Sequence, residues 1–292
     1  MISIVIPAHN EGAVLHATLS GMLDGARADE IEIVVACNGC QDNTVDVARC
    51  FGSPVKVVET KVASKIEAIN LGDAAASYFP RIYADADVIL PINAIRDVVR
   101  ILSEGSVLAA SPSISVDLSG SSILVKAFYQ TWIMLPYHRK GRVGSGVYAL
   151  SKKGRGRFGK FPEVIADDEF VRSLFQEHER AITWDSAFTI KAPATMHALI
   201  KVKTRSRLGI YQLHRIFPEF AHNHGGGIRG VLRVLLKTPR IWWAFPVYLL
   251  VNIIARWRAN CQMDSIDTYK WERDESSRQV VKNMSLDRPV EE

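Results

Sequence analysis

The sequence contains few cysteines, only four in 292 residues, and only one pair of them lies close together. Cys37-Asn38-Gly39-Cys40 has the spacing of a zinc or dithiol motif, but no second pair accompanies it. A structural zinc site and a disulfide framework are therefore disfavoured, and we expect free thiols in a reducing, cytoplasmic compartment. Residues 2–6 form an apolar, strand-like run directly after Met1, so we also expect no signal peptide.

The sequence also lacks acidic residues over a long region, residues 220–263. Within it, residues 241–255 are uncharged, but as a helix they would extend only about 22 Å, against a bilayer core of ~30 Å. Pro246 is also expected to interrupt this helix. A basic segment that carries tryptophan is typical of a helix lying in a membrane surface. A buried helix, an oligomer contact and a true span remain alternatives. The residues behind this interpretation are Arg229, Arg233, Lys237, Arg240, Trp242, Trp243, Phe245, Tyr248, Arg256 and Arg258.

The remaining composition is that of an ordinary globular protein, with 48% hydrophobic and 23% charged residues. The length suits one large domain or two small ones, with a sizeable core. The formal net charge is +5 and the pI is about 9.0. This balance favours an anionic partner such as nucleotide phosphates, a lipid surface or nucleic acid, without choosing among them.

Short apolar runs alternate with helical patterns through the first third of the chain. This alternation predicts an α/β fold with a parallel sheet, in which ligands bind at the carboxyl ends of the strands. His9 to Glu11, Asn38, and Asp85 to Asp87 all follow predicted strands. The expected strands cover residues 2–6, 31–36, 55–58 and 82–84, and the expected helices cover residues 14–23, 45–48 and 64–77.

Asp85-Ala86-Asp87 follows one of these strands and is the strongest candidate for a metal site. In an extended segment, residues i and i+2 point the same way, so both carboxylates could bind one divalent cation. Mg²⁺ takes one or two carboxylates together with substrate phosphates, and this pair suits that arrangement. The alternative is a loop with two solvated acids.

The second half of the chain no longer shows the regular alternation of strand and helix patterns. Gly144-Ser145-Gly146 precedes a strand and suggests a close approach of the backbone to another group. Asp167 and Asp168 open a probable helix, where carboxylates suit the positive end of the helix dipole. The other expected elements are helices at residues 93–102, 122–135 and 170–176, strands at 107–110, 114–116, 147–150 and 187–190, and a basic loop at 152–160.

With these motifs in order, residues 1–207 resemble the family 2 glycosyltransferases, which are inverting enzymes that use nucleotide-sugar donors. The resemblance implies the GT-A (nucleotide-diphospho-sugar transferase) fold, a mixed, mostly parallel sheet flanked by helices. The motifs are Ile4-Val5-Ile6-Pro7-Ala8-His9-Asn10-Glu11; Asn38-Gly39 with Asp42 and Thr44; Lys65-x-x-Ala68-x-Asn70-x-Gly72; Asp85-Ala86-Asp87; Gly144-Ser145-Gly146 with Phe158-Gly159-Lys160-Phe161-Pro162; and Asp167-Asp168.

The resemblance implies a role for each matching residue. On the donor side, Asn38 would lie by the base, Lys65 would lie near the diphosphate or brace the Asp85 loop, and Asp85 would face the ribose or sugar. Gly146 would let the backbone approach the donor. The loop that would hold the base and ribose contains Pro7, His9, Asn10 and Glu11.

The resemblance further implies that Asp87, with Asp85, binds Mn²⁺ or Mg²⁺. Relatives often add a late side chain to the metal or diphosphate, for which His222 or His224 is available. Asp168 would be the general base, although Asp167 and Asp168 could exchange the roles of base and helix cap. A carboxylate opposite the metal site suits proton removal from an acceptor hydroxyl.

Three departures from the family pattern limit what can be inferred. Neither Cys37 nor Asn38 is the aspartate that reads uracil in many relatives, so the donor could be linked to UDP, GDP or dTDP. Asp167 replaces the glutamate of the usual Glu-Asp pair. The Gln-x-x-Arg-Trp motif of processive synthases is absent, which favours addition of a single sugar. The nearest basic cluster could bind the diphosphate or a lipid phosphate, or be a solvated loop; it consists of Lys201, Lys203, Arg205 and Arg207.

We therefore expect a catalytic domain at residues 1–207, a helical membrane-associating segment at 208–263 and a polar tail at 264–292. The expected function is metal-dependent transfer of one sugar to a lipid-linked or saccharide acceptor, in polysaccharide or glycolipid biosynthesis, peripherally on the cytoplasmic membrane. One alternative is an inactive membrane-associated scaffold with the same fold. Another is a nucleotidyltransferase. Such an enzyme would require a Gly-rich phosphate loop after the first strand, and Pro7 to Gly12 do not form one. Nucleic acid is not an expected partner, because the basic residues flank apolar aromatic sequence.

Overall fold

The computed structural model describes residues 1–135, 143–223 and 228–266. The chain divides into two compact units, which are described separately. Unit 1 comprises Met1–Ser115, Gly141–Glu163 and Asp167–Ile190. Unit 2 comprises Val116–Lys140, Val164–Ala166 and Lys191–Glu292. All the residues of the candidate site described below belong to unit 1.

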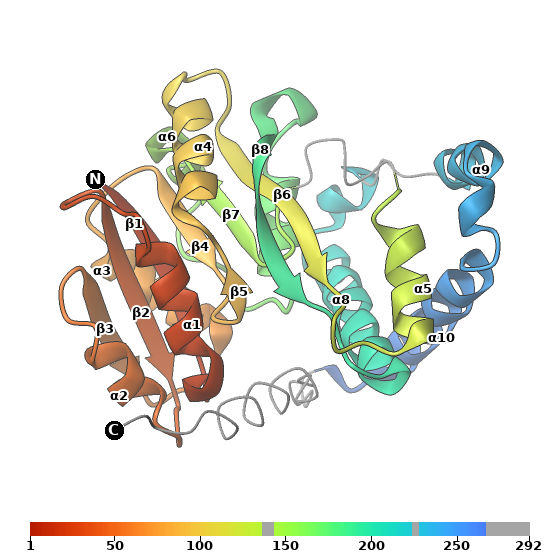
Figure 1. The fold of residues 1–292 in the computed structure, drawn as a ribbon, viewed down its shortest axis with the longest axis horizontal. Coiled ribbons are helices and arrows are strands. Elements are labelled where there is room, and N and C mark those ends of the chain that lie inside the picture. Colours follow the sequence, from red (N-terminus) through yellow and green to blue (C-terminus); the bar gives the residue numbers. More distant parts are fainter. Residues whose placement is uncertain (136–142, 224–227, 267–292) are drawn as a thin grey trace, which may run out of the picture. The chain divides into compact units, whose positions relative to one another are not determined.

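Unit 1 is built on a mixed sheet with the strand order β3-β2-β1-β4-β7-β6-β8-β5 (Figure 1). Its first four strands are parallel, whereas β7 runs antiparallel to both β4 and β6, and β5 runs antiparallel to β8. The fold class expected from the sequence is therefore confirmed. The strands are β1 (Ile2–Ala8), β2 (Ile31–Asn38), β3 (Val55–Thr60), β4 (Arg81–Ala84), β5 (Val88–Ile89), β6 (Ala109–Asp117), β7 (Val147–Leu150) and β8 (Arg180–Lys191).

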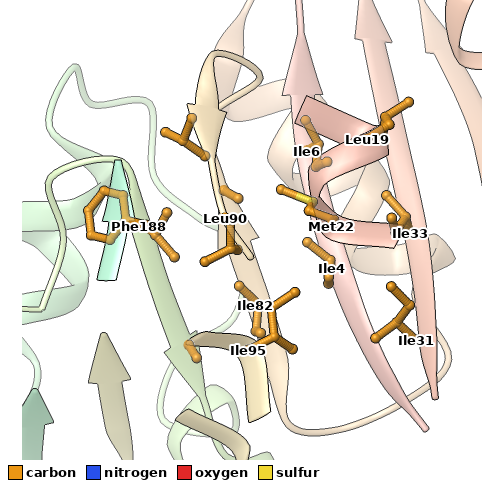
Figure 2. Packing of buried hydrophobic residues seen from close by; sticks show 14 of the residues in the cluster. Ile4, Ile6, Leu19, Met22, Ile31, Ile33, Ile82, Leu90, Ile95 and Phe188 are labelled. Atoms are coloured by element: carbon orange, nitrogen blue, oxygen red, sulfur yellow. The ribbon is translucent and has the colours of Figure 1, made fainter. Parts of the chain in front are cut away.

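Helices cover both faces of the parallel half of this sheet. On one face, Ile4 and Ile6 of β1 and Ile33 of β2 pack against Leu19 and Met22 of α1 (Figure 2). On the other face, α3 comes so close that a Cβ on Gly72 would lie 2.6 Å from Val5 Cγ1. Burial on both faces explains why these strands are largely apolar instead of alternating between apolar and polar residues. The helices of unit 1 are α1 (Gly12–Leu23), α2 (Thr44–Arg49), α3 (Lys65–Ala75), α4 (Ile92–Ser103), α6 (Lys152–Arg155), α7 (Asp167–Ser173) and the short η2 (Glu177–Glu179).

The carboxylate of Glu32 on β2 is a charged group that is buried within the sheet. It accepts hydrogen bonds from Ser3 Oγ at 2.5 Å, Lys56 Nζ at 2.5 Å and Ser77 N at 2.8 Å. Burial by itself would raise the pKa of Glu32, but these hydrogen bonds outweigh it and lower the pKa to about 2, from an ordinary 4.5. A carboxylate with a depressed pKa contributes stability above its unfolded-state pKa and loses it as the pH falls.

We therefore expect Glu32→Gln to lower the free energy of unfolding at pH 7 by about 2–3 kcal/mol. Wild-type stability should fall between about pH 5 and pH 2, and the variant should lack that part of the fall. Urea unfolding at a series of pH values measures both effects. Glu59→Gln is the control, because the exposed Glu59–Arg49 ion pair should contribute only about 0–1 kcal/mol. Equal effects of the two substitutions would contradict the prediction.

Unit 2 is helical in its described part. Helix α10 packs against α8 and α5, and Tyr248 of α10 stacks on Phe128 of α5 at 5.3 Å between ring centroids. Lys203 of α8 lies over three rings of α5, with Nζ 4.6 Å from the centroid of Trp132. The elements are α5 (Ile123–Trp132), α8 (Met196–Ile216), η3 (Pro218–Asn223), α9 (Ile228–Lys237), η4 (Pro239–Ile241) and α10 (Phe245–Met263) (Figure 1).

The structure corrects three local expectations. Residues 107–116 do not form two strands, because β6 is one strand whose first residues pair with β7. The basic residues 201–207 are not a loop, since they lie within α8, which continues without a break through residue 207. Pro246 does not interrupt a helix; it lies in the first turn of α10, where a missing N–H breaks no helical hydrogen bond. Most of the expected polar tail, residues 267–292, lies outside the described residues.

Candidate active site

A glycine loop, Gly144-Ser145-Gly146, is the centre of the candidate site. All three residues have positive φ angles, of 119°, 71° and 106°, which is uncommon for a serine. Asp85 N donates a hydrogen bond to Gly146 O at 2.8 Å. A Cβ on Gly146 would lie 3.2 Å from Asp85 Oδ2, and a Cβ on Gly144 would lie 2.9 Å from Asp168 Oδ2. The loop therefore lies directly against both carboxylates, and its two glycines make room for them.

Asp168 is held by backbone groups at the start of α7. Its Oδ2 accepts a hydrogen bond from Ser145 N at 2.9 Å, and its Oδ1 accepts one from Glu169 N at 2.8 Å. The side chain is half-buried. Asp168 is thus a fixed carboxylate that remains partly accessible.

Lys65, the first residue of α3, joins two further carboxylates. Its Nζ lies 2.8 Å from Asp85 Oδ1 and 2.9 Å from Asp167 Oδ1. Burial by itself would lower the pKa of Lys65, but Asp167 and Asp85 outweigh it and raise the pKa. Lys65 therefore stays charged and is tied to the Asp85 loop by an ion pair.

Asp167 differs from its neighbour because it is almost fully enclosed, with an exposed fraction of 4%. Besides the contact with Lys65, it accepts a hydrogen bond from Tyr148 Oη at 3.2 Å. Burial raises the pKa of Asp167, and Asp168 and Asp85 add to this, while Lys65 opposes it. Both of its oxygens are engaged inside the protein. Asp167 is consequently suited to hold Lys65 in place, and Asp168 is the better placed of the pair to meet a substrate.

Asp87 is exposed. The structure does not have the extended geometry from which the sequence analysis paired Asp87 with Asp85. The extended segment ends at Ala84, and Asp85-Ala86-Asp87 forms a turn between β4 and β5. The turn is needed because β5 leaves β4 to pair with β8. The i, i+2 alternation of a strand therefore does not apply to the two aspartates.

The carboxylate oxygens at this turn suit a hard divalent cation that takes most of its ligands from a diphosphate. Among the residues that the structure describes, no three His, Cys, Asp or Glu side chains are grouped so as to hold a metal by themselves. Asp87, with Asp85 beside it in the turn, matches a cation that needs only one or two carboxylates from the protein. His224, the additional candidate, lies outside the described residues, and nothing is shown of the His222 side chain.

The residues expected to hold the nucleotide lie at the carboxyl ends of β1 and β2, at the same edge of the sheet. Strand β1 lies between β2 and β4, and all three are parallel, so their carboxyl ends coincide. His9 Nδ1 contacts Asn38 O, and Asn10, with φ of 52°, accepts a hydrogen bond from Gln41 N at 2.7 Å. Pro7 is the penultimate residue of β1.

Glu11, at the end of the same loop, is buried, and its backbone begins α1. Its N–H donates to Thr44 Oγ1 at 2.7 Å, and its carbonyl accepts hydrogen bonds from Val14 N and Leu15 N. The loop is therefore preformed by contacts between the ends of β1 and β2. It lies one strand away from the Asp85 turn.

Two contributors to the site were not anticipated from the sequence. Tyr148 holds Asp167, and Ser145 supplies a backbone donor to Asp168. Asn70 was noted only as part of a motif, yet its amide pairs with both Phe161 N at 2.8 Å and Phe161 O at 3.1 Å. A tyrosine after a glycine loop carries no local signal of this role, because its partner is 19 residues further along the chain.

Comparisons with known proteins agree with this geometry. Residues 3–146 match the sequence model of a protein family described as glycosyl transferase family 2. No curated protein matches the sequence. Among solved structures, the mannosyltransferase PcManGT of Pyrobaculum calidifontis, in complex with GDP-Man and Mn²⁺, has a TM-score of 0.61 at 19% identity, covering 98% of this chain and 79% of its own.

Two other solved structures have comparable TM-scores and sequence identities to this chain. Glucosyl-3-phosphoglycerate synthase of Mycobacterium tuberculosis, with Mn²⁺ and UDP, has a TM-score of 0.53 at 18% identity, covering 74% of this chain and 79% of its own. TarS 1–349 of S. aureus, with UDP, has a TM-score of 0.52 at 13% identity, covering 99% of this chain and 93% of its own. At these identities the structures establish the fold, and the family match adds the class of enzyme. Residues 3–146 are a family 2 glycosyltransferase domain, and the chain has the GT-A fold.

Proposed function

We propose that this enzyme is a metal-dependent, inverting glycosyltransferase that transfers one sugar from a nucleotide-sugar donor to an acceptor hydroxyl. The observation that carries the proposal is the Gly144–Gly146 loop, which lies against Asp85 on one side and Asp168 on the other. A sugar at this loop would have a donor-side carboxylate and a proton acceptor close to it. The similar structures that contain GDP-Man or UDP with Mn²⁺ support the donor class.

In the proposed reaction, the acceptor oxygen forms a bond to the anomeric carbon while the bond from that carbon to the diphosphate oxygen breaks. Asp168 takes the proton of the attacking hydroxyl. Attack from the face opposite the leaving group inverts the anomeric configuration. Lys65 and Asp167 keep Asp85 in position. The nucleoside diphosphate leaves with the bonding electrons, so charge and protons balance.

Asp87, together with Asp85, would hold the divalent cation, Mn²⁺ or Mg²⁺. When bound, the cation supplies neutralisation of the negative charge that grows on the leaving diphosphate. Lys65 is positioned to add positive charge near the same group. Pro7, His9, Asn10, Glu11 and Asn38 would enclose the base and ribose, with UDP-, GDP- and dTDP-linked sugars as the candidate donors.

The proposed acceptor is a lipid-linked or a free saccharide, in polysaccharide or glycolipid biosynthesis, reached by a chain bound peripherally to the cytoplasmic membrane. An inactive scaffold with this fold is disfavoured, because the Lys65 ion pairs and the backbone donors to Asp168 would have no use there. A nucleotidyltransferase is disfavoured because the loop after β1 is tied to β2 by side chains and contains no glycine-rich run.

Thermal-shift measurements with UDP, GDP and dTDP, each with and without Mn²⁺, test the proposal. A ligand at about 100 times its Kd adds ~2.7 kcal/mol to stability. For a chain of this size, that should raise Tm by several degrees. We expect one of the nucleotides to do so only when Mn²⁺ is present. Absence of any metal-dependent shift, together with no turnover of the matching sugar donors, would refute the assignment.

A further inference from the structure

Helix α10 in unit 2 has its small side chains buried and its large apolar side chains outside. Val251, Ala255 and Ala259 recur every four residues and are at most 1% exposed. The adjacent residues Leu249, Leu250, Ile253 and Trp257 recur at helical spacing as well, yet they are 47–67% exposed. Surface helices usually show the opposite arrangement, with an apolar stripe facing the core. The outward face of α10 is therefore built to contact something apolar.

The same apolar surface continues into the segment before α10. Trp242 and Trp243 lie in the turn between η4 and α10 and are 59% and 57% exposed. The indole N–H of Trp242 donates to Leu235 O at 2.8 Å, which fixes the turn against α9. Tryptophans are favoured at membrane interfaces, because the ring is amphipathic. We define the α10 face as Trp242, Trp243, Leu249, Leu250, Ile253 and Trp257.

The charges of the segment that carries this face have one sign. Lys237, Arg240 and Arg256 of this segment are exposed, and no acidic residue occurs anywhere in residues 220–263. A second copy of the chain, docked through the same face, would bring these cations together. An anionic lipid surface instead complements them, and each basic residue near such a surface strengthens binding.

A membrane-spanning role does not fit the described part of the chain. No helix there combines the length and the apolar character that crossing a bilayer requires. The buried stripe of α10 is also occupied by α8, which leaves only one side of the helix for lipid. One-sided apolar exposure with basic neighbours is the pattern of a helix that lies in the interface plane.

We propose that the α10 face docks on an anionic lipid bilayer, with its tryptophans and leucines at the acyl boundary and Lys237, Arg240 and Arg256 at the headgroups. The inference deepens the membrane location given under the proposed function by naming the surface and the lipid class. It rests on that location, but its test is independent of sugar transfer. Docking would bring the enzyme to acceptors that are themselves anchored in the membrane.

Flotation of the full chain with vesicles tests this surface. We expect the protein to float with vesicles that contain phosphatidylglycerol, and at least tenfold less with pure phosphatidylcholine or in high salt. The triple variant Trp242→Ala, Trp243→Ala, Trp257→Ala should lose at least tenfold of the bound fraction. Trp184→Ala is the matched control, because Trp184 is 58% exposed but lies on β8 in unit 1. It should float like the wild type.

Two further measurements separate the possible failures. The nucleotide-induced thermal shift should be equal in the wild type and the triple variant, which shows that the variant is folded and keeps the site. Wild-type protein that does not float, or a triple variant that floats normally, overturns the proposal. A wild type that is dimeric and unbound to vesicles, with a monomeric triple variant, would assign the face to a second copy instead and would also overturn it.

Discussion

Replacement of Asp168 by asparagine is expected to lower kcat for sugar transfer by about 10²–10⁴-fold, which is the usual contribution of a positioned general base. Asparagine keeps the size of the side chain but cannot accept the proton of the acceptor hydroxyl. The KM for the donor should change little, because Asp168 faces the acceptor in the proposed reaction. Steady-state kinetics at saturating donor and acceptor, with Tm measured in parallel, tests this expectation.

Asp167→Asn provides the comparison, because it makes the same chemical change one residue away. It should weaken the anchoring of Lys65, and so act through donor binding and stability more than through kcat. A larger loss of kcat in Asp167→Asn than in Asp168→Asn would reverse the two roles. Comparable and small losses in both would remove this carboxylate pair from the mechanism.

The glycine loop offers a second way to disturb Asp168 without touching it. In Gly144→Ala, the new Cβ would lie 2.9 Å from Asp168 Cβ and Oδ2, at a φ of 119° that alanine adopts poorly. This variant should therefore also lose kcat, by displacing the carboxylate. Gly159→Ala is the matched control, since a Cβ there would meet no atom within 4 Å. If Gly144→Ala retained full activity, the position of Asp168 against the loop would not matter for catalysis.

Replacement of Asp87 by alanine is the second large effect, with metal-dependent turnover expected to fall by at least about 10²-fold. A divalent cation contributes several kcal/mol of charge stabilisation in such reactions, and Asp87 is the exposed carboxylate at the proposed cation site. Because the side chain is exposed, Tm without ligands should change little. Activity measured as a function of Mn²⁺ concentration tests the prediction.

The control for Asp87→Ala is Asp185→Ala, which removes an exposed aspartate of β8 that pairs with Arg100 at 3.0 Å. Exposed pairs of this kind contribute about 0–1 kcal/mol, so activity should be unaffected. The nucleotide-induced thermal shift in Mn²⁺ should disappear in Asp87→Ala and persist in Asp185→Ala. Unchanged turnover of Asp87→Ala at saturating Mn²⁺ would contradict the assignment.

Several features could be predicted because they depend on neighbours close in the chain. The apolar runs of β1 and β2 indicated strands of a parallel sheet, and α1 and α3 cover the two faces of those strands. Parallel strands place their carboxyl ends at one edge, so sequence order alone predicted that His9, Asn38 and Asp85 lie at the same edge of the sheet. The expectation that failed depended instead on contacts between residues far apart in the chain. The turn at Asp85-Ala86-Asp87 could not be predicted, because it depends on the pairing of β5 with distant β8.

Fold class, family resemblance and the residue types available for catalysis could be inferred from amino-acid order, since periodicity and ordered motifs are local properties of the chain. The tertiary structure settled which acid is enclosed and which is accessible. Lys65 and Tyr148 reach Asp167 across 102 and 19 residues of chain, respectively, and leave Asp168 at the glycine loop. It also decided that the small residues of α10 pack inward while its large apolar residues face out. Both outcomes depend on which elements meet in space, and no local pattern encodes that.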